Sequence, residues 1–378
     1  MGQFQSMSEQ YQFIIEHLKS RQDLASIGVL YRNNLSAICL AHELTRAGIP
    51  FSMREGGKLR FFSHWAINDI LNFLRFSFSD KSLVTFEGIW SKLSCPIRKH
   101  QIEDLKQMPM DRSIFEILAE QPGVTSKHRR KYLELRKQFK VLNTLTPAQA
   151  IRFIRNQLEY DQAMARICEA LGFSEEYIGG LLDMLISIAQ HERTIVEFAN
   201  RLTNLEEQMK SSYKNKDSNA VTLTTIHSAK GLKWEEVIVI DLVEGIIPER
   251  ETIKAEQSGQ KELIEEERRL FYVGMTRAKR HLTLCSVDYY HQKRVKVSRF
   301  VREVSYVLSG KNPQEISKNE EPTLQSDLVA GLVVQHKAFG EGVIIKEEGN
   351  VILVRFKDGT QRSFLKDICD QMKLIWAV

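Results

Sequence analysis

Short apolar runs and longer amphipathic stretches alternate at the start of the chain. Residues 27–31 (IGVLY) form an apolar run that predicts a buried strand. Residues 35–47 show the apolar spacing of an amphipathic helix, which we expect to end at Gly48. Residues 50–54 predict a second strand. A strand–helix–strand order of this kind favours a parallel sheet.

The next part of the chain has the pattern of helices only. A first helix is predicted over residues 66–78, and apolar positions then recur at helical spacing with no strand-like alternation. The further predicted helices are 112–120, 127–142, 147–171, 174–190 and 194–209. We therefore expect an all-helical insertion over residues 80–191.

Strand patterns return after a polar stretch at residues 210–219. Strands are predicted at 221–226, 237–241 and 282–286, and helices at 261–276 and 298–308. This pattern predicts that one α/β domain is interrupted by the insertion, with its first part at residues 1–79 and its second at 192–309.

Residues 310–378 differ from the rest of the chain. Residues 310–327 are polar, with two prolines and many charges, and predict a linker. In residues 328–378 valine and isoleucine alternate with charged residues, and glycine-bearing turns recur. This alternation predicts a small antiparallel β-barrel, and we expect Phe339, Phe356 and Phe364 to form its core.

Composition narrows the class of protein without naming a function. The chain has 378 residues, of which 43% are hydrophobic and 27% charged, as in globular proteins of two or three domains. No apolar run is long enough for a membrane helix, the first residues lack the features of a signal peptide, and five scattered cysteines form no zinc motif. We expect a cytoplasmic protein without a metal site of its own. The net charge of +5 is compatible with nucleic acid but is not decisive.

A polar stretch, TTIHSAKGLKW at residues 224–234, follows one predicted strand and precedes another. Ser228 is predicted to cap a short helix at residues 229–232, where free backbone N–H groups attract anions. Gly231 permits close approach to the backbone. The alternative is an ordinary capped turn without a ligand.

Two further stretches carry candidate phosphate-binding arginines. In VLYRNN, Arg32 follows a strand end, where ligands of open α/β sheets gather, and its planar guanidinium suits phosphate. In EEERRLFYVGMTRAKRHLTL, a predicted helix containing Gly274 leads to Arg277. A glycine inside a helix costs about 1 kcal/mol against alanine, so we expect a packing reason for Gly274. The alternatives are a surface Tyr-Arg pair and a common basic helix end.

In chain order, VLYRNN resembles motif IV, TTIHSAKGLKW motif V and EEERRLFYVGMTRAKRHLTL motif VI of the UvrD/PcrA/Rep family of superfamily 1 DNA helicases. The similarity extends to GGKLRFFSHWAINDILNFLRF, to SRFVREV and to LVVQHKAFGEGVIIK, and so covers nearly the whole chain. It implies a second RecA-like domain with a helical insertion, followed by a Tudor-like barrel.

The resemblance also implies roles for individual residues. Arg32 and Arg277 would reach the γ-phosphate of ATP, Tyr31 would stack on the adenine, and Gly231 and Lys233 would lie near the nucleotide. The residues expected to contact single-stranded DNA are Thr225, His227, Ser228, Lys230 and either Tyr289 or Tyr290. The family usually has glutamate, which contacts the ribose, where this chain has Lys233. The effect of the lysine stays open.

The sequence contains no G-x-x-x-x-G-K-[ST] loop. Asp241 ends a Walker-B-like run (VIVID), but we discount it because motif V precedes it. We therefore expect the C-terminal portion of a longer 3′-5′ helicase. ATP and Mg²⁺ would bind the complete protein, with an N-terminal RecA-like domain as partner, and this chain alone would bind neither tightly and would not hydrolyse ATP.

Several points stay open on this interpretation. The insertion lacks the family's Gly-Ile-Gly hairpin, and its basic run is either a duplex contact or a solvated helix face; the run comprises Lys127, Arg129, Arg130, Lys131, Arg136, Lys137 and Lys140.

The resemblance suggests single-stranded and junction DNA as substrates, a nucleoid-associated location, and RNA polymerase as a partner of the barrel. The alternatives are a motor subunit of a helicase–nuclease, and a nucleic-acid- or polymerase-binding factor that does not unwind DNA.

Overall fold

The computed structural model divides into two compact units, residues 1–304 and 305–378. It describes residues 1–54, 61–213, 219–291, 293–310, 333–336, 339–348, 351–357, 359–365 and 375–377. Most of the predicted linker therefore lies outside the described residues, as do Gly56, Gly57 and Lys58. The domain boundaries given above stay predictions.

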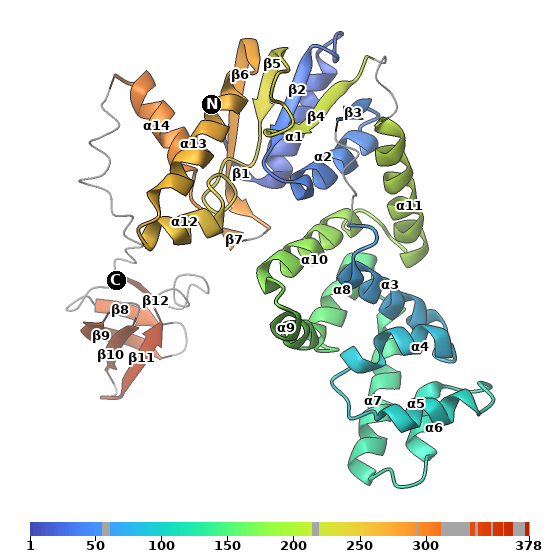
Figure 1. Cartoon of the computed structure of the whole chain (residues 1–378). Helices are drawn as coiled ribbons and strands as arrows, with labels where there is room; N and C mark the ends of the chain where they lie inside the picture. Colours follow the sequence, from blue (N-terminus) through green and yellow to red (C-terminus); the bar gives the residue numbers. More distant parts are fainter. Residues whose placement is uncertain are drawn as a thin grey trace. The chain divides into compact units, whose positions relative to one another are not determined.

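The first unit contains a sheet in the order β1-β6-β5-β2-β4-β3, with β7 paired to β6 (Figure 1). All neighbours along this path run parallel, and only β7 is antiparallel. The strands are β1 (Gly2–Ser6), β2 (Ile27–Tyr31), β3 (Phe51–Met53), β4 (Val221–Thr225), β5 (Trp234–Val239), β6 (Ala278–Tyr290) and β7 (Lys293–Arg294). The predicted parallel α/β fold is confirmed.

Helices cover both faces of this sheet, in which β2 is apolar and buried on both sides. On β2, Val29 and Tyr31 pack into the core with α1 (Met7–Lys19) and α2 (Asn34–Arg46). Leu30 points to the other face, where it joins residues of α13 (Lys261–Met275) and the start of α14 (Arg299–Leu308). The carboxyl end of β2 is thus fixed from both sides.

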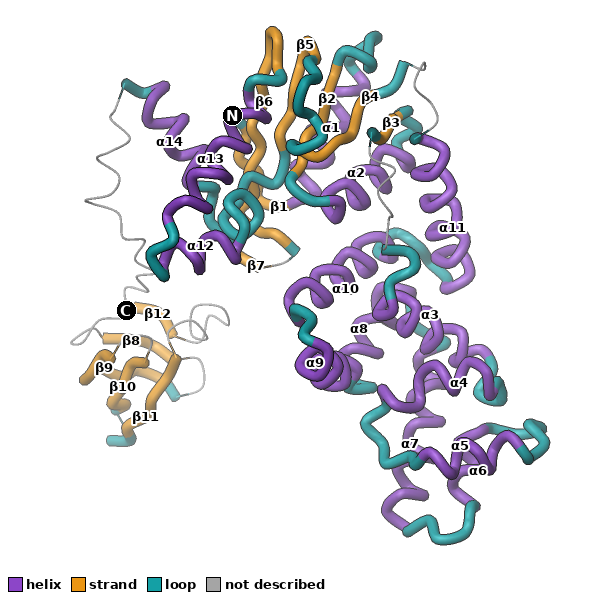
Figure 2. The backbone as a smooth tube through the Cα atoms, viewed as in Figure 1, coloured by secondary structure: helices purple, strands orange, loops and turns teal. Residues whose placement is uncertain are grey.

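Helices make up the chain between β3 and β4, and Figure 2 shows no strand among the residues described there. The α-helices are α3 (Trp65–Phe78), α4 (Leu83–Ile89), α5 (Lys99–Lys106), α6 (Ile114–Glu120), α7 (Ser126–Leu142), α8 (Pro147–Asn156), α9 (Tyr160–Leu171), α10 (Glu175–Ala189) and α11 (Ile195–Ser212). A 3₁₀ turn, η1 (Trp90–Lys92), follows α4. None of the described helices is long and apolar enough to cross a membrane.

The second unit holds an antiparallel sheet in the order β11-β10-β9-β8-β12, as the alternating pattern predicts. Its strands are β8 (Val333–His336), β9 (Gly340–Glu348), β10 (Val351–Phe356), β11 (Gln361–Leu365) and β12 (Ile375–Ala377). We expected Phe339, Phe356 and Phe364 to form its core. Phe356 is buried and Phe364 partly so, but Phe339 is 41% exposed, and the Arg362 guanidinium lies 4.2 Å from the centre of its ring.

Candidate functional site

Arg32 lies directly after β2, at the carboxyl edge of the parallel sheet. The next residue, Asn33, caps α2 by accepting hydrogen bonds from the N–H groups of Leu35 and Ser36. The strand before Arg32 and the capped helix after it therefore restrict the backbone conformation of Arg32. Its Nη2 lies 2.8 Å from Oε1 of Glu267 on α13, and 3.0 Å from Oε1 of Glu249.

Tyr31 is only 2% exposed and belongs to the sheet's core. Its ring therefore has no face open to a base in this structure. The adenine-stacking role expected of Tyr31 stays a prediction, and the burial of the ring argues against it.

Residues 226–233, which we name the motif V turn, connect β4 to β5. We expected a short helix capped by Ser228, but the structure has turns and no helix there. Ser228 is itself held by Thr225: Thr225 Oγ1 accepts a hydrogen bond from the Ser228 N–H at 3.2 Å and lies 3.1 Å from the Ser228 hydroxyl. Because Thr225 is buried at the strand end, it anchors the turn.

The motif V turn presents its polar side chains to solvent. His227, Lys230 and Lys233 are exposed or half-exposed, as is Gly231, which has a φ of +86° that glycine adopts without strain. Ser228 is half-buried. The predicted binding residues of this stretch, apart from Thr225, are thus accessible to a ligand.

Arg277 follows α13 and reaches back over the end of that helix. Its Nε donates to the carbonyl of Val273 at 2.9 Å, and its Nη1 donates to the carbonyl of Leu232 at 3.2 Å. The Arg277 carbonyl accepts from the N–H of Trp234 at 3.0 Å. Arg277 thereby ties α13 to the motif V turn, while Arg32 is held by Glu267 of the same helix.

The two tyrosines at the end of β6 differ in exposure. Tyr289 is 47% exposed and lies opposite Arg294 of β7. Tyr290 packs against the core, and its burial raises the pKa of its hydroxyl well above the ordinary value. Tyr289 is therefore the one whose ring is open to a base.

Asp241 is buried after β5 and faces the N-terminal helix α1. Gln10 Nε2 donates to its Oδ1 at 2.7 Å, and the Asp241 N–H donates to Gln10 Oε1 at 3.2 Å. Burial raises the pKa of its carboxyl above the usual aspartate value. Among the described residues, no group of three or more His, Cys, Asp or Glu side chains is placed to hold a metal ion.

The carboxylates that hold Arg32 were not found from the sequence. Glu265 and Arg269 are four residues apart, a spacing at which they can pair along a helix, but Glu265 pairs with Arg268 at 3.2 Å. Glu267 is the buried member of the EEE run, and the helical period that places Ile264 and Phe271 in the core on the same face was the available signal. Glu249 gave no signal, because its contact depends on the path of the preceding loop.

The basic run of the insertion lies on α7. Arg129 donates to the carbonyl of Ala119 at 2.9 Å, and Arg136 pairs with Glu116 at 2.7 Å. These two cations therefore stabilise the helical region itself. The exposed basic residues include Lys127, Lys137 and Lys140.

Comparison with known proteins places these features in a family. A model of the UvrD-like helicase C-terminal domain matches residues 1–289, which is most of the chain. The chain belongs to this family. The resemblance stated from motifs IV, V and VI is therefore confirmed.

Relatives of this UvrD-like chain bear the names of DNA helicases. It is 28% identical to the putative ATP-dependent DNA helicase YjcD of Bacillus subtilis over 76% of this chain and 37% of the relative. It is 26% identical to DNA helicase II of Escherichia coli over 90% of this chain and 51% of the relative. For the ATP-dependent DNA helicase PcrA of Staphylococcus epidermidis the identity is 25%, over 88% and 49%. The chain thus spans about half the length, or less, of these relatives.

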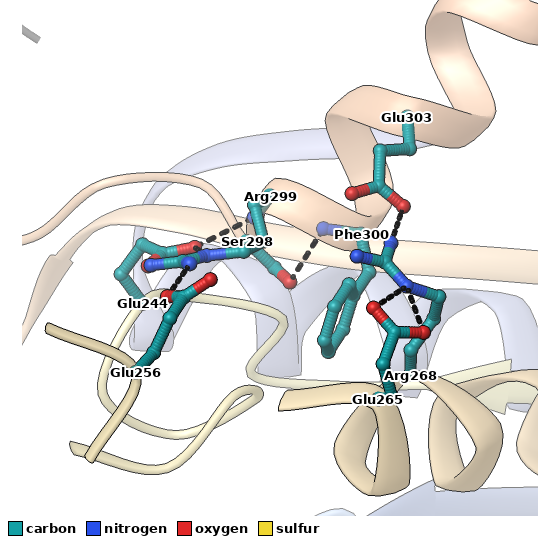
Figure 3. A network of polar contacts seen from close by, with 8 residues as sticks. All are labelled: Glu244, Glu256, Glu265, Arg268, Ser298, Arg299, Phe300 and Glu303. Carbon is teal, nitrogen blue, oxygen red and sulfur yellow. Dashed lines mark hydrogen bonds and ion pairs between the residues drawn. The ribbon is translucent and has the colours of Figure 1, made fainter. Parts of the chain in front are cut away.

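In this UvrD-like domain, an ionic network fixes α13 and the loop before Glu249 (Figure 3). The Arg299 guanidinium of α14 donates to both carboxylate oxygens of Glu244, with the shortest distance 2.7 Å from Nη2, and also pairs with Glu256. Arg268 of α13 pairs with Glu303 and lies 5.1 Å from the centre of the Phe300 ring. Residues of the SRFVREV stretch therefore hold α13, which carries Glu267, and the segment between Glu244 and Glu256, which carries Glu249.

Proposed function

We propose that this chain is the C-terminal motor portion of an ATP-dependent 3′-5′ DNA helicase of the UvrD type. In this proposal Arg32 and Arg277 complete a nucleotide site whose phosphate-binding loop belongs to an N-terminal RecA-like domain. The observation that carries the proposal is the common anchoring of both arginines on α13, next to an exposed motif V turn.

The chemistry of phosphoryl transfer is compatible with a site whose arginines and phosphate-binding loop lie on different domains. Catalysis depends on positioning and on neutralising the charge that develops on the phosphate oxygens, and an arginine finger contributes roughly 10³ to 10⁵ in rate. Two guanidinium groups held by one helix move together. Hydrolysis then requires the two domains to close, because the fingers and the phosphate loop lie on different domains.

ATP and Mg²⁺ are the cofactors in this proposal. The guanidinium groups of Arg32 and Arg277 fit the phosphates, and Gly231 and Lys233 lie on the exposed turn beside Arg277. Mg²⁺ neutralises the phosphates when it is bound. We assign its ligands to the N-terminal domain.

Single-stranded DNA is the proposed nucleic-acid ligand. His227, Ser228 and Lys230 offer polar and charged contacts on the motif V turn. Thr225 stabilises that turn by accepting the hydrogen bond from the Ser228 N–H. Tyr289 offers a ring on which a base can stack, a contact worth about 1–3 kcal/mol. Because Arg277 bonds to Leu232 of the same turn, movement of the finger and of the DNA contacts is coupled.

The remaining partners rest on the same proposal. We propose junction DNA as a further substrate, a cytoplasmic, nucleoid-associated location, and RNA polymerase as the partner of the second unit. The half-exposed Phe339 offers an apolar contact for that partner.

ATP hydrolysis by two protein forms tests the proposed function. We expect hydrolysis that single-stranded DNA stimulates in the complete protein, and none from residues 1–378 of this chain alone. Hydrolysis by this chain alone at the rate of the complete protein would contradict the division of the site. Binding of single-stranded DNA without any stimulated hydrolysis would favour the alternative of a binding factor.

A further inference from the structure

Arg32 contacts two carboxylates that differ in burial and in geometry. Glu267 takes two contacts, from Nη2 at 2.8 Å and from Nε at 3.4 Å, and its side chain is 9% exposed. Glu249 takes one contact, from Nη2 at 3.0 Å, and its side chain is 44% exposed. The first pair is a largely buried two-point contact, whereas the second has one exposed partner, Glu249.

The energetics of the two pairs differ accordingly. Breaking a buried ion pair leaves a charge without compensation and is strongly unfavourable. Loss of the Glu249 contact costs little, because water solvates the exposed Glu249 carboxylate while Arg32 keeps its pair with Glu267. Glu267 therefore stays bound to Arg32, while Glu249 can leave at small cost.

Arg32 also keeps donors for another anion. Within the part of the chain that the structure describes, no group accepts a hydrogen bond from its Nη1. A phosphate oxygen that takes the place of Glu249 at Nη2 would have Nη1 beside it. A guanidinium offers two parallel N–H groups to phosphate in this geometry.

The loop that carries Glu249 is anchored at a distance from the contact. Glu244 is held by Arg299, and Glu249 itself directly precedes α12 (Arg250–Gln257), where its carbonyl accepts from the Ile253 N–H at 3.0 Å. The backbone thus keeps the Glu249 side chain near Arg32. Only a rotation of that side chain is needed to release the arginine.

We propose that Glu267 and Glu249 have opposite roles at Arg32. Glu267 is a positioning residue that orients the guanidinium in every state. Glu249 occupies the place of a phosphate oxygen while the nucleotide is absent and leaves when the nucleotide binds. This inference rests on the proposed function, since it requires Arg32 to meet a phosphate group.

Two isosteric variants of the complete protein test the proposal by ATP hydrolysis with saturating single-stranded DNA. Glu267→Gln weakens the orientation of Arg32, and we expect kcat to fall by up to about 10²-fold with a smaller change in KM for ATP. Glu249→Gln removes the competing charge, and we expect KM for ATP to fall by about two- to fivefold. The ratio kcat/KM should thus fall in Glu267→Gln and rise in Glu249→Gln, whereas a loss of folding would lower the activity of either variant.

Matched controls lie next to each residue. Glu266 is exposed on α13, and Glu251 on α12 pairs only with the exposed Lys254 among the described residues. Glu266→Gln and Glu251→Gln should behave as the wild type. A parallel loss of kcat in Glu267→Gln and Glu249→Gln would overturn the proposal, as would a Glu267→Gln variant that matches Glu266→Gln.

A second measurement separates failure of this inference from failure of the proposed function. Absence of DNA-stimulated hydrolysis in the wild-type complete protein would contradict the proposed function. Thermal unfolding of this chain then tests the contact itself. We expect the unfolding midpoint to fall by several degrees in Glu267→Gln and to stay near the wild-type value in Glu249→Gln; equal midpoints would overturn the positioning role.

Discussion

Gly274 allows α13 to pack closely against the motif V turn. A Cβ atom at this position would lie 3.3 Å from Cγ2 of Ile226, the first residue of the motif V turn. The packing reason that the sequence suggested for this glycine is therefore the close approach of α13 to that turn. A Cβ atom at Gly179, inside α10, would meet no atom within 4 Å beyond its chain neighbours and the backbone of its own helix.

Alanine at these two glycines should have different effects on stability. Gly179→Ala should raise the free energy of unfolding by about 0.5–1 kcal/mol, because alanine favours the helix. Gly274→Ala should gain less or lose stability, because the Ile226 side chain must move. Chemical denaturation of both variants measures the free energy of unfolding. An equal increase at both positions would show that α13 and the motif V turn are not closely packed at Gly274.

At the scale of elements, helix α13 organises the candidate site. It carries Glu267 toward Arg32, leads into Arg277, and contacts α14 through Arg268, Glu303 and the stacked rings of Phe271 and Phe300. The sequence predicted this helix to within one residue at its C-terminal end. It did not predict the helix's ionic partners, because pairs between distant segments depend on tertiary packing and not on helical spacing.

The link between α2 and α11 should make stability depend on pH. Arg201 Nε donates to His42 Nδ1 at 3.2 Å, and burial, with Arg201 and Arg46 nearby, lowers the pKa of His42 to about 3. In the unfolded chain the pKa of histidine is about 6.5. The unfolded state therefore binds more protons below that pH, and stability should fall as the pH drops below about 6.5.

A histidine variant isolates this contribution. His42 should account for roughly 1–2 kcal/mol of the stability lost between pH 7 and pH 5. His42→Gln should show a smaller loss over this range, while the exposed His100→Gln should keep the wild-type dependence. Denaturation at both pH values provides the measurement, and an unchanged pH dependence in His42→Gln would contradict the assignment.

At the scale of the whole molecule, local patterns predicted the architecture better than the site. Buried strands such as β2 were recognised because they are apolar throughout. The first residues of β6 are mostly exposed, and β1 is polar, so neither gave a strand signal. The predictions that Ser228 caps a helix and that Phe339 is buried were wrong for a related reason. Both depend on neighbouring residues in the fold, which the local sequence does not specify.

The central claim is that Arg277 acts as a finger in a nucleotide site shared between two domains. The most direct test is DNA-stimulated ATP hydrolysis by the complete protein carrying Arg277→Ala, measured together with its affinity for ATP. Our account predicts a fall in kcat of roughly 10³-fold or more with ATP binding largely retained. Hydrolysis by the variant at the wild-type rate would contradict it.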